Sequence, residues 1–287
     1  MQALTADESF LSQRGGGRVE QVFSRAINLL IPGKPGLLTL LCAAYDNAPN
    51  SCRLALTHFD HLFRPGESVR FTDSGIYIGD DKWIDIRNCH RWHTPRAALS
   101  PADFTRIAWR RWQNIIVEQL HEDDTLFLYR GDNPFYKAMG RELQQRRETL
   151  FSALYENKNI SAAVANMLGL GIGLTPSADD YLVGLSVILF IDGHPANSFR
   201  EVFLAALQCA RNNTTPLSAI TLEAAINQRY RESIAGFINL MINQPTTFSI
   251  EAIADIKNIG SSSGSDMLLG MADACALSQT YGGNYVS

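Results

Sequence analysis

Hydrophobic residues follow two different spacings along the chain, and the change between them falls near residue 98. Before it, short runs rich in Leu, Ile, Val and aromatic residues alternate with Gly, Pro, Asn and Asp, which is typical of strands joined by turns. An initial helix is predicted at residues 19–31. We therefore expect a small β-rich domain at residues 1–98. Its predicted strands are residues 37–45, 52–57, 69–72, 75–78 and 83–86.

From residue 99 to residue 287, apolar residues recur at helical spacing. Ser100, Pro101 and Asp103 mark the first start, because serine caps a helix, proline fits its first turn and an acid faces the dipole. The fold class is therefore α+β, with a small N-terminal β-rich domain followed by a larger helical domain that carries two glycine-rich loop–helix units. The predicted helices are residues 104–120, 134–155, 160–168, 180–191, 198–210, 217–242, 250–256 and 266–278.

Two segments of the helical part share the pattern Ser-small-x-Asp-x-Leu-x-Gly-apolar. They are residues 177–185 and 263–271, and each follows a polar loop with glycine, at residues 169–176 and 260–262. The first N–H groups of a helix have no partner inside it, and the helix dipole makes them attractive to an anion. Glycine before the helix lets a ligand approach the backbone closely. Two such starts facing one cleft would form an anion-binding or phosphate-binding pocket.

Helix capping explains part of the same pattern without a ligand. Ser177 with Asp180, and Ser263 with Asp266, fit the capping box, in which the serine and the acid satisfy N–H groups reciprocally. The first loop holds more glycine than a cap requires, which favours a ligand site, whereas both explanations stay open for the second copy. Asp179 adds a second carboxylate, and the pair would repel a bare phosphate unless a cation such as Mg²⁺ or an arginine bridges them.

The candidate site combines both loops, both helix starts and a polar segment at residues 211–218. Asp179 and Asp180 are the candidate catalytic residues, which would orient an amide or Mg²⁺; no nucleophile–base pair is visible in the sequence. Ser218 could instead cap the helix after the polar segment. The candidate ligand-binding residues are Gly169, Gly171, Gly173, Thr175, Ser177, Thr214, Thr215, Ser218, Ser262, Ser263, Gly264 and Asp266.

Two other patterns carry weaker signals. His-x-x-His occurs at residues 58–61 and 90–93, but neither pair stands in a recognisable helix or zinc loop, so we assign no protein metal site. Arg130 precedes Asp132 and Asn133, either of which can cap the next helix. Arg130 itself is either an anion clamp or a surface cation.

Composition excludes several classes of protein. The net charge of −4 gives no broad attraction for nucleic acid or an anionic membrane. No apolar segment is long enough to span a bilayer, and the N-terminus does not resemble a signal peptide, so we expect a cytoplasmic location. Five scattered cysteines without Cys-x-x-Cys indicate reduced thiols. No lysine stands near Gly173, which argues against a P-loop, and a predicted helix precedes the loop where a dinucleotide fold requires a strand.

Residues 169–184, Gly-x-Gly-x-Gly-Leu-Thr-Pro-Ser-Ala-Asp-Asp-Tyr-Leu-x-Gly, resemble a motif of the AllH-like family, formerly a domain of unknown function (DUF2877). Thr214-Thr215-x-Leu217-Ser218 and residues 260–270 agree in order, and the similarity covers nearly the whole chain. The resemblance implies a subunit of an oxamate carbamoyltransferase in purine (allantoin) nitrogen catabolism, where phosphate cleaves oxalurate to oxamate and carbamoyl phosphate. It also implies FdrA-like partner subunits.

Two departures from the family pattern suggest a changed substrate. Ala178 stands where the family commonly has Gly, and Ile172 where Pro is often found. The chain also lacks the Ser-Thr-Arg-Thr phosphate motif of ordinary transcarbamoylases, so their mechanism is not transferred. The expected function is binding of carbamoyl phosphate or a related small anion at the glycine-rich helix starts. The alternative is a non-catalytic scaffold or regulatory subunit of an FdrA-like complex.

Overall fold

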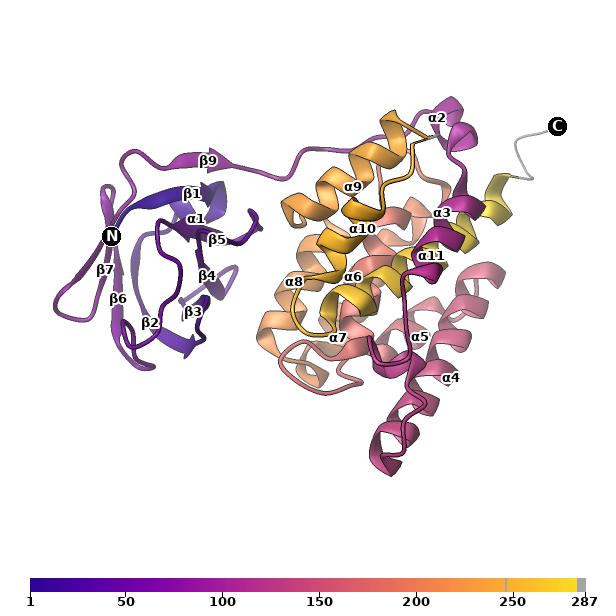
Figure 1. The fold of residues 1–287 in the computed structure, drawn as a ribbon, viewed down its shortest axis with the longest axis horizontal. Coiled ribbons are helices and arrows are strands. Elements are labelled where there is room, and N and C mark those ends of the chain that lie inside the picture. Colours follow the sequence, from indigo (N-terminus) through magenta and orange to yellow (C-terminus); the bar gives the residue numbers. More distant parts are fainter. Residues whose placement is uncertain (246, 283–287) are drawn as a thin grey trace. The chain divides into compact units, whose positions relative to one another are not determined.

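The computed structural model describes residues 1–245 and 247–282, and the chain divides into two compact units (Figure 1). The first unit comprises Met1–Pro95 together with Arg229–Glu232. The second comprises Arg96–Gln228 and the chain from Ser233 onward. The first unit is built on a sheet and the second on helices, which confirms the α+β prediction.

The first unit is a curved nine-stranded sheet in the order β8-β7-β6-β2-β3-β4-β5-β1-β9. The β4–β5 and β1–β9 pairs are parallel and the other neighbouring pairs are antiparallel. The N–H of Asp85 donates to the carbonyl of Met1 at 2.8 Å, so the end of β8 meets the start of the chain. The strands are β1 Ala3–Asp7, β2 Gly15–Val22, β3 Ala26–Leu30, β4 Leu37–Cys42, β5 Ser51–Leu54, β6 Ser68–Phe71, β7 Gly75–Ile78, β8 Lys82–Asp85 and β9 His90–Trp92; a short helix, α1, spans Glu8–Leu11.

The helix predicted at residues 19–31 is wrong, because this segment forms the β2–β3 hairpin. Ile27 and Leu29 alternate along β3 and both are fully buried in the core of the sheet. Between them Asn28 is also buried, and it is satisfied across the sheet, donating to Gln21 at 2.8 Å and accepting from Thr39 at 2.9 Å. The pairing of side chains across three strands decides the structure here, whereas the apolar spacing alone fits either element.

The helix predicted at residues 217–242 is interrupted, because residues Arg229–Glu232 belong to the first unit. Gln228 takes a positive φ of 58°, which ends the helical path. Arg229 then forms an ion pair with the buried Asp7 at 2.8 Å, and the hydroxyl of Thr94 donates to the carbonyl of Tyr230 at 2.9 Å. These contacts hold the segment against β1 and separate helices α8 and α9.

The second unit contains helices α2 to α11 in the described part of the chain. The Ser100 capping box is confirmed. The helix predicted at residues 104–120 is instead two helices, α2 and α3, because Ile107 takes an extended conformation between them. The helices are α2 Pro101–Arg106, α3 Trp109–Glu118, α4 Pro134–Glu156, α5 Ile160–Met167, α6 Ser177–Leu189, α7 Arg200–Ala210, α8 Pro216–Ile226, α9 Glu232–Asn243, α10 Ile250–Lys257 and α11 Ser263–Gly282, with 3₁₀ turns at Leu126–Leu128, Pro195–Phe199 and Arg211–Asn213.

Over residues 1–245 and 247–282, no helix combines the length and the apolar character that crossing a membrane requires.

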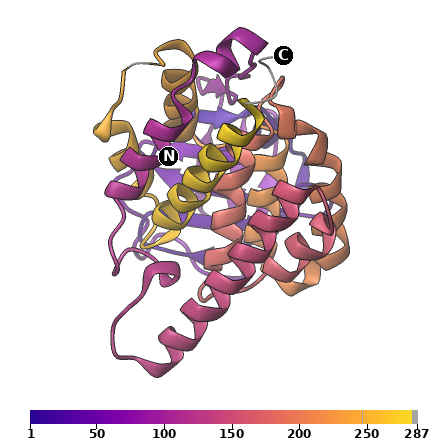
Figure 2. The same ribbon diagram turned by 90° about the vertical axis from the view of Figure 1, so that its right-hand side faces the viewer.

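Helices α6 and α11 form the centre of the second unit. Every residue of α6 is buried, and Figure 2 shows α11, in yellow, running beside α3, in magenta. A Cβ atom on Gly184 of α6 would lie 1.8 Å from the carbonyl oxygen of Met267. A Cβ atom on Gly270 of α11 would lie 2.1 Å from the carbonyl oxygen of Tyr181. The two motifs therefore contact each other reciprocally, since each glycine meets the residue that follows the other motif's aspartate.

Replacing Gly184 with alanine should destabilise the protein, because the added methyl group overlaps the backbone of α11. We expect a loss of about 3 kcal/mol in the free energy of unfolding, measured by urea denaturation. Gly236→Ala in α9 is the matched control, since its Cβ would meet nothing within 4 Å; it should stabilise by about 0.5–1 kcal/mol through helix propensity. Equal effects of the two substitutions would contradict the close contact of α6 and α11.

Candidate functional site

The two glycine-bearing loops meet at the starts of α6 and α11. The hydroxyls of Thr175, in the first loop, and Ser263, in the first turn of α11, lie 3.0 Å apart and share a hydrogen bond. The close contact of the two helices explains this meeting, because both motifs reach their glycine two helical turns after their serine. The structure thus brings together the two segments that repeat in the sequence.

The first loop needs its glycines for conformation and for space. Gly169 has φ +79°, and a Cβ there would lie 1.9 Å from the carbonyl oxygen of Asn213. Gly171 has φ +133°, and its Cβ would lie 2.4 Å from the first backbone nitrogen of α6. Gly173 has φ +91° and faces open space. No described residue accepts a hydrogen bond from the N–H groups of residues 171–174, so this stretch of backbone can bind an acceptor.

Asp179 fastens the first loop to the polar segment. One carboxylate oxygen accepts from the N–H of Gly169 at 2.8 Å. The other accepts from the hydroxyl of Ser218 at 2.7 Å and from the hydroxyl of Thr214. Burial raises the pKa of Asp179 above its ordinary value, and these three donors oppose that rise. These three donors therefore stabilise the charge of Asp179, and the same contacts hold the loop in place.

Thr215 is the residue that caps α8. Its side-chain oxygen accepts from the N–H of Ser218 at 3.1 Å, and its hydroxyl donates to the carbonyl of Leu174 at 2.5 Å. The alternative that Ser218 caps this helix is wrong, because its hydroxyl is bound to Asp179. Both threonines of the polar segment thus contact the first loop or its aspartate.

The capping box predicted for the first copy is also wrong. Pro176 occupies the N-cap position, and it forms no side-chain hydrogen bond, so Ser177 already lies inside the helix. Each serine instead lies near the aspartate of the other motif. Ser263 and Thr175 lie near Asp180 and lower its pKa, and Ser177 does the same for Asp266, against the larger upward effect of burial.

In the second copy the backbone makes the turn into α11. Gly260 has φ +66°, and the carbonyl of Ser262 accepts from the N–H of Asp266 at 2.9 Å. A Cβ on Gly264 would lie 2.0 Å from the carbonyl oxygen of Ile256, so α10 packs directly on this start. Gly264 therefore serves packing, while Ser263 faces the first loop.

Asp180 and Asp266 form a pair of buried carboxyls at this meeting point. They are 2% and 0% exposed, and the Oδ2 atom of each has no hydrogen-bond partner among the described residues. Burial raises the pKa of Asp180 to about 7. Burial also raises the pKa of Asp266 to about 8, and the nearby charge of Asp180 adds to that rise. At neutral pH the pair therefore keeps at least one proton, and it presents two unpaired oxygens to any ligand that reaches it.

Several contacts of the site have no signal in the sequence. The hydroxyl of Thr125 donates to Asp266 from the loop before the 3₁₀ turn at Leu126–Leu128. Tyr181 donates to Asp273 at 2.7 Å, and Arg147 binds the same carboxylate through two nitrogens, at 2.6 and 2.7 Å. This second network fixes α6 and α11 to α4 through Asp273, which lies two helical turns after Asp266.

The histidine pairs do not contribute to the site. The side chains at both ends of residues 58–61 and 90–93 are exposed. Across the described part of the chain, no group of three or more His, Cys, Asp or Glu residues could hold a metal ion.

Comparison with known families identifies both parts of the chain. A model described as oxamate carbamoyltransferase subunit AllH matches residues 167–275, and one described as the AllH family N-terminal domain matches residues 2–91. Together they match more than half of the chain, and the first includes both loop–helix units. No solved structure matches the chain.

The paired carboxyls should make the protein less stable as the pH rises. Their pKa values, about 7 and about 8, lie above the ordinary value of 3.8. The folded state therefore holds more protons than the unfolded state between pH 5 and pH 8, and stability falls across this window by up to about 1.4 kcal/mol per proton and pH unit. Thermal unfolding between pH 5 and pH 9 should show this fall, and Asp180→Asn should flatten it. A variant with an unchanged pH dependence would refute the burial of a titrating Asp180.

Proposed function

Because the chain belongs to the family of oxamate carbamoyltransferase subunit AllH, we propose that it is a subunit of an oxamate carbamoyltransferase-like complex. We further propose that carbamoyl phosphate or a related small anion binds where the first glycine loop meets the starts of α6 and α11. The observation that carries this proposal is that the loop with free backbone donors joins, through Thr175 and Ser263, the helix starts that hold two unpaired, buried carboxyl oxygens.

The two sets of groups match the two ends of such a ligand. A phosphate or carboxylate group needs donors, which the N–H groups of residues 171–174 and the positive end of α6 supply. A carbamoyl NH₂ group needs acceptors, which the Oδ2 atoms of Asp180 and Asp266 supply. A ligand that displaces the hydrogen bond between Thr175 and Ser263 would gain access to these oxygens.

The protonation of the site also suits an anion. A pair of fully ionised aspartates would repel carbamoyl phosphate, but burial leaves this pair with at least one proton at neutral pH because the pKa values of Asp180 and Asp266 are raised. In this proposal Asp180 contacts the ligand and Asp179 is a positioning residue, since all its recorded contacts hold the loop and the polar segment together. A Mg²⁺ ion could take the place of the proton, and a metal titration separates the two forms.

A second role, as a non-catalytic scaffold or regulatory subunit of an FdrA-like complex, is favoured by one observation. Ile172 and Leu174, in the same loop, expose 44% and 37% of their surface. Apolar side chains at the tip of a polar loop are suited to burial against another protein. In that role the partner would cover the loop, and the carboxyls below it would be structural.

Calorimetric titration of the purified chain with carbamoyl phosphate, phosphate, oxamate and Mg²⁺ tests the proposal. We expect saturable binding of carbamoyl phosphate that is about tenfold weaker or more in Asp180→Asn, because that substitution replaces an acceptor with a donor. Asp80→Asn, on an exposed turn of the sheet unit, is the matched control and should bind like the native chain.

The outcomes separate the two roles. Binding that Asp180→Asn leaves unchanged would rule out this site. Absence of binding to the isolated chain, together with loss of co-purification with an FdrA-like partner in Ile172→Ser/Leu174→Ser, would support the scaffold or regulatory role.

A further inference from the structure

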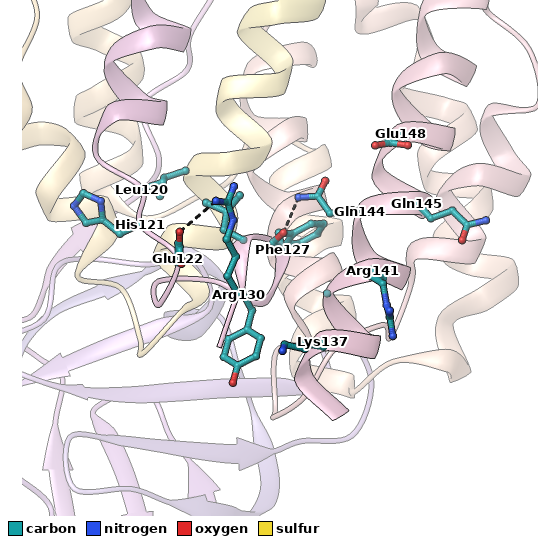
Figure 3. A pocket seen from close by; sticks show the side chains of 13 residues that line it. Leu120, His121, Glu122, Phe127, Arg130, Lys137, Arg141, Gln144, Gln145 and Glu148 are labelled. Carbon is teal, nitrogen blue, oxygen red and sulfur yellow. Dashed lines mark hydrogen bonds and ion pairs between the residues drawn. The ribbon is translucent and has the colours of Figure 1, made fainter. Parts of the chain in front are cut away.

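A cleft lies in the helical unit, and none of its lining residues belongs to the glycine loops. It has a volume of about 980 Å³ and opens between the first half of α4 and the segment that runs from Leu120 to Arg130 (Figure 3). None of the candidate site residues lines it. Ligand-binding clefts commonly measure about 300–1,000 Å³, so this one is large enough for a compact organic ligand.

Gly140 allows α4 to pack closely on the 3₁₀ turn at Leu126–Leu128, beside the cleft. A Cβ on Gly140 would lie 2.7 Å from the carbonyl oxygen of Leu126. The amide of Gln144, one turn later, donates to the carbonyl of Phe127 at 2.6 Å. These two contacts fix the floor of the cleft. The neighbouring face of α4 is exposed and carries Lys137, Arg141, Gln145 and Glu148, which line the cleft (Figure 3).

Cationic side chains stand on both walls of the cleft. Binding an anion there would break no strong ion pair, because their present ion pairs are exposed or absent. Arg130 makes a long ion pair with Glu122, at 3.5 Å, in which both side chains are exposed. Lys137 reaches Asp132 at 3.3 Å, and that carboxylate is fully exposed outside the cleft. Arg141 has neither an ion pair nor a side-chain hydrogen bond with any residue between 1 and 245 or 247 and 282. Exposed pairs of this kind contribute little to stability.

We propose that this cleft binds a phosphorylated small molecule of nucleotide size. Arginine recognises phosphate oxygens through its planar fork, and lysine adds a point charge. The apolar part of the lining that is not fully buried, Leu128 and the ring of Tyr129, can contact a base or a similar flat group. An acidic peptide laid along α4 would meet both Glu148 and Glu122, whereas a compact anion at Arg130 has only Glu122 to displace from its exposed ion pair.

Calorimetry with ADP, pyrophosphate and inorganic phosphate tests this proposal on the full chain. We expect ADP and pyrophosphate to bind, with affinity falling as salt is added. Arg141→Ala and Lys137→Ala should each weaken binding about tenfold, because each removes a charge-assisted contact. Glu148→Gln should strengthen it. Arg110→Ala, an exposed arginine on α3 outside the cleft, is the matched control and should leave binding unchanged.

Three results would overturn the proposal. They are no saturable binding of ADP or pyrophosphate, binding that both cleft variants leave unchanged, and saturation by a poly-glutamate peptide but not by ADP. Native-like circular dichroism and an unchanged melting temperature confirm that each variant is folded. The result is independent of the glycine-loop site, because Asp180→Asn should keep its affinity for ADP.

Discussion

The close contact between α6 and α11 is the constraint on which the candidate site depends. Gly184 and Gly270 each allow the partner helix to approach until its backbone occupies the place of a side chain. This contact also brings together the aspartates, about one turn before each glycine, and the serines, two turns before it. The repeated sequence is therefore explained as two halves of one contact. Neither copy has this geometry by itself.

Three aspartates are buried at this contact, and they differ in the number of hydrogen bonds that they accept. Asp179 receives three donors from the loop and the polar segment. Asp180 and Asp266 each keep an unpartnered oxygen, and burial raises the pKa of both. Asp179 and Asp180, which are adjacent in the sequence, therefore do not bind one partner together. The first fastens a loop, and the second joins a carboxyl from the far end of the chain.

The sequence predicted elements well where local signals were complete. Turn residues flank the strand at Gly75–Ile78, and an asparagine caps the helix at Pro134–Glu156. Local sequence therefore determines both elements. The prediction failed where contacts between distant residues decide the structure. The segment predicted as a helix forms β2 and β3 instead, because β2 pairs with β6 and β3 pairs with β4. The capping box, one of the two explanations that the motif allowed, is a local pattern, whereas each serine lies near the aspartate of the other motif. The contact of Thr125 with Asp266 and the cleft beside α4 depend on tertiary packing, so no residue spacing in the sequence predicts them.

The unpaired carboxyl oxygens bear on whether the site is more than scaffold. A buried acceptor without a partner costs stability, and folded proteins satisfy the great majority of such groups. If the motif served packing alone, the two glycines would suffice, and an asparagine or alanine would replace each aspartate without burying a titrating group. Two buried acids next to the close contact of two helices oppose stability. Together with a neighbouring loop whose backbone donors are also free, they suit binding of a ligand that carries both acceptors and donors. That combination is what a carbamoyl group joined to an anion presents.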